Sequence, residues 1–155
     1  MDLKLSYHEL YGYNEITEYR WNQLTDIMEK AKKNRPAALK RADRAGNAWY
    51  RSEKMVGMML YLDRFSEDLS EFEKRIDYLA ELGITYVHFM PLLKSREGNN
   101  DGGYAVADYL MVDEKFGTMD QLERVMKLLK KRGIRTCIDF VLNHTARNIY
   151  GLRNV

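Results

Sequence analysis

The sequence predicts an α/β fold in which strands alternating with helices follow a helical N-terminal segment. Two observations carry this prediction. The chain changes character near residue 55, where a polar, helix-rich stretch gives way to short apolar runs. Segments with apolar residues at helical spacing separate these runs. We therefore expect two parts, a helical segment at 1–54 and an α/β part at 55–155.

The N-terminal segment predicts two helices. The first has five apolar residues at helical spacing: Trp21, Leu24, Ile27, Met28 and Ala31. A second helix is expected from Pro36 to about Ala45, because proline suits a first helical turn and Gly46 can end the helix.

The stretch 29–44 is strongly basic, with seven Lys or Arg against two Asp or Glu. It is either a site for an anion or a nucleic acid, or a solvated helix face. We favour the solvated face, because no aromatic residues are interleaved with the charges.

Three strands and two helices are expected after residue 55. The apolar run 56–62 predicts a strand buried on both faces. A helix follows, capped by Ser66 or Ser70 and ended by Gly83, with one apolar face: Leu69, Phe72, Ile76, Leu79 and Leu82. The second strand is 84–90.

The next helix begins at Thr118, where Thr118 and Gln121 have capping-box spacing, and it ends at Gly133. The third strand is 134–142. Strand–helix–strand units with buried strands predict a parallel sheet.

A connection of 27 residues, 91–117, joins the second strand to the next helix and is far longer than usual for such loops. Active sites gather in long loops at the carboxyl ends of parallel strands. Asp101 offers a hydroxyl acceptor and Tyr104 a flat ring, which together suit a sugar. A long turn with structural Asp and Tyr explains the same residues equally well.

Polar residues also gather where the third strand ends. Strand alternation would place Asp139, Val141 and Asn143 on one face. Asp139, Asn143 and His144 make a poor zinc site, although oxygen ligands for calcium remain open. The alternative for His144 is a structural histidine. We expect His88 to be a packed polar residue, and His8 has no partner that the sequence identifies.

Composition narrows the function classes. The chain has 155 residues, a net charge of +2 and one cysteine, Cys137. The small net charge gives no case for a nucleic acid or a membrane as partner. A single cysteine excludes an intrachain disulfide or a CxxC site. The start lacks the apolar region of a signal peptide. We expect a cytoplasmic protein.

Several motifs, in order, resemble the α-amylase superfamily of glycoside hydrolases and transglucosidases, and within it most strongly the amylosucrases. They are DRF at 63–65, LGITYVHFMPLL at 82–93, EGNNDGGYAV at 97–106, FGTMD at 116–120 and DFVLNHT at 139–145. The resemblance implies about three strands of a TIM (β/α)8 barrel behind a helical segment. It also implies glucosyl transfer from, or hydrolysis of, sucrose or a related α-glucoside.

The resemblance assigns roles to five residues. It makes Asp101, Tyr104 and His144 the residues that bind the glucosyl ring, with Tyr104 as the stacking platform. Asp139 would be a structural aspartate that orients neighbouring strand ends. Asn143 matches a calcium ligand of many α-amylases, but amylosucrase-like members generally lack that calcium, so we expect no metal and no cofactor.

The family's catalytic carboxylates come from later strands, so we assign no catalytic residue and expect this chain to be inactive alone. Residues after Thr145 depart from the family pattern, and we expect a truncated or shifted reading frame near Ala146. The alternatives are a small α/β sugar-binding module without catalysis, or an interaction protein that uses the basic helix.

Overall fold

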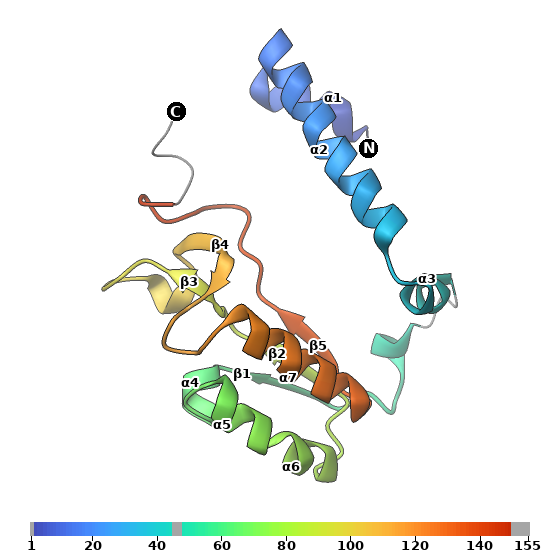
Figure 1. Cartoon of the computed structure of the whole chain (residues 1–155), viewed down its shortest axis with the longest axis vertical. Helices are drawn as coiled ribbons and strands as arrows, with labels where there is room; N and C mark the ends of the chain where they lie inside the picture. Colours follow the sequence, from blue (N-terminus) through green and yellow to red (C-terminus); the bar gives the residue numbers. More distant parts are fainter. Residues whose placement is uncertain (1, 45–47, 150–155) are drawn as a thin grey trace. The chain divides into compact units, whose positions relative to one another are not determined.

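A computed structural model describes residues 2–44 and 48–149 of the chain (Figure 1). Gly46, the expected end of the second helix, and residues 150–155 of the divergent tail lie outside the described residues. The chain divides into two compact units, Met1–Ala48 and Trp49–Val155.

The first unit is helical, as predicted. It contains α1 (Leu3–Tyr11), α2 (Glu15–Asn34) and α3 (Ala37–Arg44). Asp2 caps α1, and Asn14 caps α2 in a capping box with Thr17. The helix expected around 21–31 therefore begins earlier in the chain.

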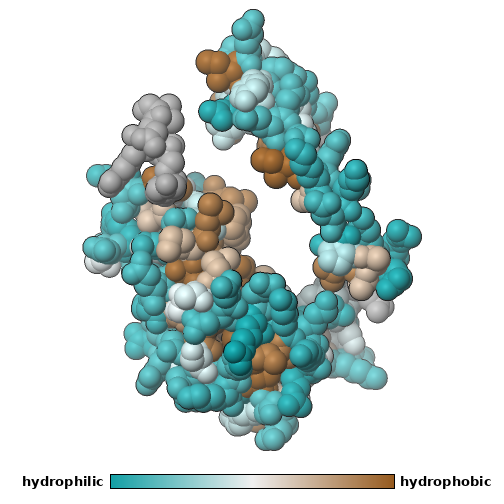
Figure 2. Space-filling model, in the orientation of Figure 1, coloured by the Kyte–Doolittle hydropathy of each residue, from teal (hydrophilic) through white to brown (hydrophobic). Residues whose placement is uncertain are grey.

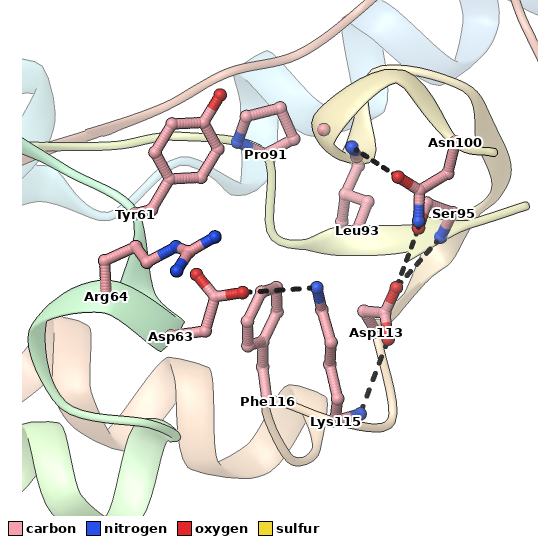
Figure 3. A pocket seen from close by; sticks show the side chains of 12 residues that line it. Tyr61, Asp63, Arg64, Pro91, Leu93, Ser95, Asn100, Asp113, Lys115 and Phe116 are labelled. Carbon is pink, nitrogen blue, oxygen red and sulfur yellow. Dashed lines mark hydrogen bonds and ion pairs between the residues drawn. The ribbon is translucent and has the colours of Figure 1, made fainter. Parts of the chain in front are cut away.

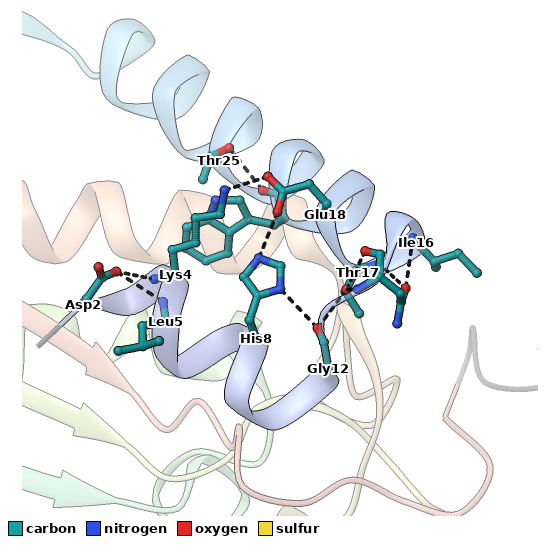
Figure 4. Close-up of polar contacts among 11 residues, drawn as sticks. Asp2, Lys4, Leu5, His8, Gly12, Ile16, Thr17, Glu18 and Thr25 are labelled. Atoms are coloured by element: carbon teal, nitrogen blue, oxygen red, sulfur yellow. Dashed lines mark hydrogen bonds and ion pairs between the residues drawn. The ribbon is translucent and has the colours of Figure 1, made fainter.

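His8 joins α1 to α2, although the sequence identified no partner for it (Figure 4). Its side chain is only 5% exposed. Its Nε2 lies 3.0 Å from Glu18 Oε2, and its Nδ1 lies 3.1 Å from the carbonyl oxygen of Gly12. Lys4 Nζ donates to the other Glu18 oxygen at 2.6 Å and is the main reason why the pKa of Glu18 lies below its ordinary value.

The second unit is built on a parallel sheet in the order β1-β2-β5, which confirms the predicted strand direction. Its helices and strands follow in chain order: η1 (Trp49–Arg51), β1 (Gly57–Leu60), α4 (Leu62–Phe65), α5 (Leu69–Lys74), α6 (Ile76–Glu81), β2 (Tyr86–Phe89), β3 (Leu93–Ser95), η2 (Asp101–Gly103), β4 (Val106–Val112), α7 (Met119–Lys131) and β5 (Arg135–Ile138).

Helices cover one face of this sheet. Val87 and Phe89 of β2 are fully buried in a core that includes Phe72 of α5, Leu79 of α6 and Leu129 of α7. Leu60 of β1 joins the same core. Alternation along the strands sends every second side chain to this face.

The expectation that 56–62 is buried on both faces is wrong. Met59 is 67% exposed, and the burial of β1 alternates. Among residues 48–149, helices pack on only one side of the sheet, so the side chains that point to the other side stay accessible. An apolar run cannot by itself show how many of its faces are covered.

The helix predicted to follow β1 is divided into α5 and α6 at Arg75, and the short α4 was not predicted. The N-cap of α5 is Asp68, whose Oδ1 accepts from Glu71 N at 2.8 Å. The expected caps, Ser66 and Ser70, do not have this role. Ser66 is instead buried and donates to carbonyl oxygens of its own turn. The predicted capping box of Thr118 and Gln121 at α7 is confirmed.

The connection 91–117 is a folded hairpin where a loop was expected. β3 and β4 pair antiparallel with irregular register. A small core lies beneath them, formed by Leu93, Val106 and Val141 with Tyr104 and Tyr109 against it. Two irregular ladder positions weaken the alternating pattern that would have identified these strands from sequence.

Candidate sugar-binding site

Asp139 stands at the carboxyl end of the sheet, directly after β5. Parallel register places His88 of β2 beside Cys137 of β5, and Asp139 follows two residues later on the same face. His88 Nε2 lies 2.7 Å from Asp139 Oδ1. Tyr104, from the end of η2, donates its hydroxyl to Asp139 Oδ2 at 2.6 Å. Asp139 thus links β2 of the parallel sheet to the connection that carries the β3–β4 hairpin.

The protonation of this cluster follows from its hydrogen bonds. Burial acts to raise the pKa of the Asp139 carboxyl, but the hydrogen bonds from Tyr104 and His88 outweigh it and keep that pKa below its ordinary value. Asp139 is therefore a carboxylate at neutral pH, and His88 Nε2 must carry the proton between them. The hydrogen bond to Asp139 is the main cause that raises the pKa of Tyr104 to about 12.

Asp101 lies on the same turn as Tyr104. It is exposed, and its φ of 56° is in the left-handed region that few residues other than glycine adopt. Its side chain is accessible to solvent, and Tyr104 follows three residues later at the end of the same turn. A carboxylate and an aromatic ring presented together can accept hydroxyl hydrogen bonds and cover an apolar ring face.

The expected strand to Leu142 is too long, because β5 ends at Ile138. The alternation predicted for Asp139, Val141 and Asn143 therefore does not hold. Val141 turns into the hairpin core, while Asn143 and His144 are exposed in the segment that follows. Tyr109 fastens this segment, since its hydroxyl donates to the Val141 carbonyl and, at 3.4 Å, to that of His144.

The structure thus brings three of the site residues together and leaves two apart. Tyr104 and Asp139 are hydrogen-bonded and Asp101 shares the turn with Tyr104, whereas the side chains of Asn143 and His144 form no hydrogen bond with these three among the described residues. Sequence reasoning missed His88 as a member of this group. The signal that could have found it is strand alternation, which places His88 and Asp139 on one face of adjacent strands.

A cavity of about 220 Å³ lies beside this group, between α4, the hairpin and the turn before α7 (Figure 3). Tyr61, Asp63 and Arg64 form one wall, and Lys115 and Phe116 another. None of the five predicted site residues lines it. Within the described ranges, no three His, Cys, Asp or Glu residues are grouped so that they could hold a metal ion, and no helix is long and apolar enough to span a membrane.

Comparisons with known proteins place these features in a family context. The family model described as "Alpha amylase, catalytic domain" matches residues 36–153. A glucan 1,6-alpha-glucosidase from Streptococcus pneumoniae is 40% identical over 79 residues, which are 51% of this chain and 14% of that protein.

Two solved structures are also similar. The isomaltulose synthase SmuA from Protaminobacter rubrum superimposes with a TM-score of 0.58 and 31% identity, over 62% of this chain and 18% of its own. A variant of MutB in complex with the substrate sucrose gives a TM-score of 0.55 and 33% identity, over the same shares of the two chains. The chain thus spans less than a fifth of the length of each of these relatives.

Proposed function

The chain belongs to the α-amylase family, and from this premise we propose that it supplies part of the glucosyl-binding pocket of an α-glucoside-processing protein. The hydrogen-bonded group Tyr104–Asp139–His88 carries the proposal, because it fixes an aromatic ring at the carboxyl ends of adjacent parallel strands. Substrates of barrel enzymes bind at that end.

The roles follow from the accessible chemistry. The Tyr104 ring stacks on the sugar, while Asp101 accepts hydrogen bonds from its hydroxyl groups. His144 contributes a further hydrogen bond from the exposed segment after β5, while Asp139 and Asn143 are structural. Asp139 uses both of its carboxylate oxygens on protein groups, which supports a structural role.

The finer proposal is that the sugar is sucrose and that the longer protein is amylosucrase-like, transferring or releasing its glucosyl unit. The sucrose complex of the similar MutB variant supports sucrose as the ligand. Retaining glycosidases need two carboxylates about 5 Å apart. The family motifs in this chain assign no such pair, so we propose binding without turnover.

Sucrose titration of the 155-residue chain, followed by calorimetry or amide NMR shifts, tests the proposal. We expect saturable binding and a weaker affinity in Asp101→Asn, by about 3- to 10-fold, because the amide keeps an acceptor oxygen but loses the charge that strengthens a hydrogen bond from a sugar hydroxyl. Glu97→Gln, an exposed carboxylate of the same connection, is the matched control and should leave the affinity unchanged.

Absence of binding to sucrose, glucose and isomaltose alike would contradict the proposed pocket. Equal weakening in Asp101→Asn and Glu97→Gln would show a general charge effect instead. Release of glucose or fructose from sucrose by the purified chain would overturn the claim that it binds without turnover.

A further inference from the structure

The turn that presents Asp101 and Tyr104 has an unusual backbone. Three successive residues have positive φ: Asp101 at 56°, Gly102 at 70° and Gly103 at 95°. The two glycines adopt this region freely, whereas for Asp101 it costs at most about 1–2 kcal/mol. A Cβ on Gly103 would lie 3.1 Å from Pro91 Cβ, so the turn also packs closely. Such a conformation persists only when its surroundings hold it.

Asn100 provides the nearest restraint. Its side-chain Oδ1 accepts from Gly103 N at 3.3 Å. Its carbonyl oxygen accepts from the same Gly103 N at 3.2 Å and from Ala105 N at 3.0 Å. Both acceptors of Asn100 therefore close the turn, and its side chain must keep one orientation to do so.

Ser95 and Asp113 fix that orientation (Figure 3). Asn100 Nδ2 donates to Ser95 Oγ at 3.2 Å, and Ser95 Oγ donates onward to Asp113 Oδ2 at 2.9 Å. Ser95 is only 8% exposed, so its hydroxyl has little access to water. Asp113 is itself held, because its backbone N donates to the carbonyl oxygen of Leu92 at 2.8 Å.

The directions of these bonds make one continuous chain. A carboxylate can only accept, so Asp113 orients the Ser95 proton, and Ser95 is left to accept from the Asn100 amide. The amide then presents its oxygen to Gly103. Chains of this kind in a partly buried setting strengthen one another.

We propose that Asp113, Ser95 and Asn100 are positioning residues that hold the Asp101–Tyr104 turn in its sugar-binding geometry. None of the three needs to touch the sugar. The claim that the turn serves sugar binding rests on the proposed function. The claim that these residues hold the turn rests on the hydrogen bonds alone. Loss of these hydrogen bonds releases the turn, and the Tyr104 hydroxyl then separates from Asp139.

The test compares Asp113→Ala with Asp113→Asn in the 155-residue chain. Two quantities are measured: the sucrose affinity, and the titration of the Tyr104 phenol by NMR of ¹³C-labelled tyrosine. Asp113→Ala should weaken sucrose binding by about 3- to 10-fold, the range for one lost hydrogen bond. It should also move the pKa of Tyr104 from about 12 toward the ordinary value of 10.0. Asp113→Asn keeps an acceptor oxygen for Ser95 and should therefore retain most of the sucrose affinity and most of the rise in the Tyr104 pKa.

Glu114→Gln is the matched control, because Glu114 is the exposed next residue and pairs with Lys94 outside the chain of bonds. It should leave both quantities unchanged. If Asp113→Ala fails to fold, Ser95→Ala breaks the same chain at a smaller side chain. An unchanged Tyr104 titration and affinity in a folded Asp113→Ala or Ser95→Ala chain overturns the proposal.

The two proposals fail differently. A lowered Tyr104 pKa in variants of a chain that binds none of sucrose, glucose and isomaltose, wild type included, refutes the proposed function and supports the positioning of the turn. A lowered Tyr104 pKa with unchanged sucrose affinity refutes the claim that the positioning serves the sugar.

Discussion

At the scale of single residues, Asp139 has the most consequences, because one carboxylate serves two partners from different segments. His88 comes from β2 and Tyr104 from the hairpin, and both hydrogen bonds are short. Hydrogen bonds to a charged group stabilise a protein by about 1.5–3 kcal/mol each, more than those between neutral groups. The strand end and the hairpin are therefore coupled through one side chain.

Asp139→Asn should lower the free energy of unfolding at pH 7 by about 1–3 kcal/mol and flatten its pH dependence in two windows. The folded pKa of Asp139 lies below its ordinary value of 3.8, so its contribution is present above that value and is lost as the pH falls through the folded pKa. The folded pKa of Tyr104 is raised, so its contribution is present below pH 10.0 and is lost as the pH rises toward about 12.

Urea unfolding of the wild-type and Asp139→Asn chains from pH 2 to pH 12 measures these slopes. Glu97→Gln is again the control and should keep the wild-type profile in both windows. A parallel loss of stability at all pH values in Asp139→Asn would contradict the ionic origin of the effect.

At the scale of single elements, the start of α7 shows how strongly local sequence can determine structure. Thr118 Oγ1 accepts from Gln121 N at 3.2 Å, and Gln121 Oε1 accepts from Thr118 N at 2.8 Å. This reciprocal pair was readable from sequence because both groups lie within one turn. The Asp68 cap of α5 was not identified, because two neighbouring serines offered the same chemistry.

Gly117→Ala should destabilise the chain more than Gly133→Ala does. Both glycines have positive φ, 125° and 76°, so each substitution strains the backbone by about 1 kcal/mol or more. A Cβ at Gly117 would also lie 2.4 Å from Gln121 Oε1 and push that side chain out of the capping box, whereas a Cβ at Gly133 meets nothing within 4 Å. We expect an additional loss of about 0.5–2 kcal/mol for the broken cap.

Thermal unfolding of the two single variants and of Gln121→Ala decides this prediction. If the cap explains the difference, Gly117→Ala should add little destabilisation beyond backbone strain once Gln121 is already alanine. Equal stability of Gly117→Ala and Gly133→Ala would show that Gln121 moves aside without cost.

At the scale of the whole molecule, the fold class could be predicted from the sequence, but the site could be predicted only in part. Three parallel strands, their covering helices and a helical N-terminal segment are confirmed, and the similar solved structures identify the strands with their covering helices as part of a TIM barrel. The spacing of apolar residues and the helix-capping residues are local signals in the sequence, which is why the fold class could be predicted. Strand alternation could have indicated the link from His88 to Asp139 only once β2 and β5 were known to pair, and no local pattern encodes the hydrogen bonds from Asn100 to Asp113.

The surface of the second unit carries large exposed apolar residues, and Figure 2 shows hydrophobic residues on the face that it draws. Leu110 is 79% exposed and Leu142 is 76% exposed. β1 and β5 are the edge strands of the three-stranded sheet, and their outer edges pair with no other strand of the described residues. Exposed apolar groups and open strand edges both favour association.

We expect the purified chain to associate with rising concentration. The double variant Leu110→Ser/Leu142→Ser should associate less, because about 25 cal/mol is lost for each Å² of apolar surface that no longer becomes buried. Sedimentation velocity over a range of concentrations measures the effect. Asn99→Ser, at an exposed polar residue of the same unit, is the control and should associate like the wild type. A monomer at all concentrations would contradict the prediction.

The hairpin core has a consequence for how the chain can diverge over generations. Leu93, Val106 and Val141 pack under β3 and β4, apart from the larger core that binds the helices to the sheet. Changes confined to this small core should add to changes in the larger core as long as the Tyr104–Asp139 hydrogen bond, which couples the hairpin to the strand end, is kept. Natural variation can therefore rebuild the segment that carries Asp101 and Tyr104, and so shift ligand preference, while the sheet beneath it is inherited unaltered.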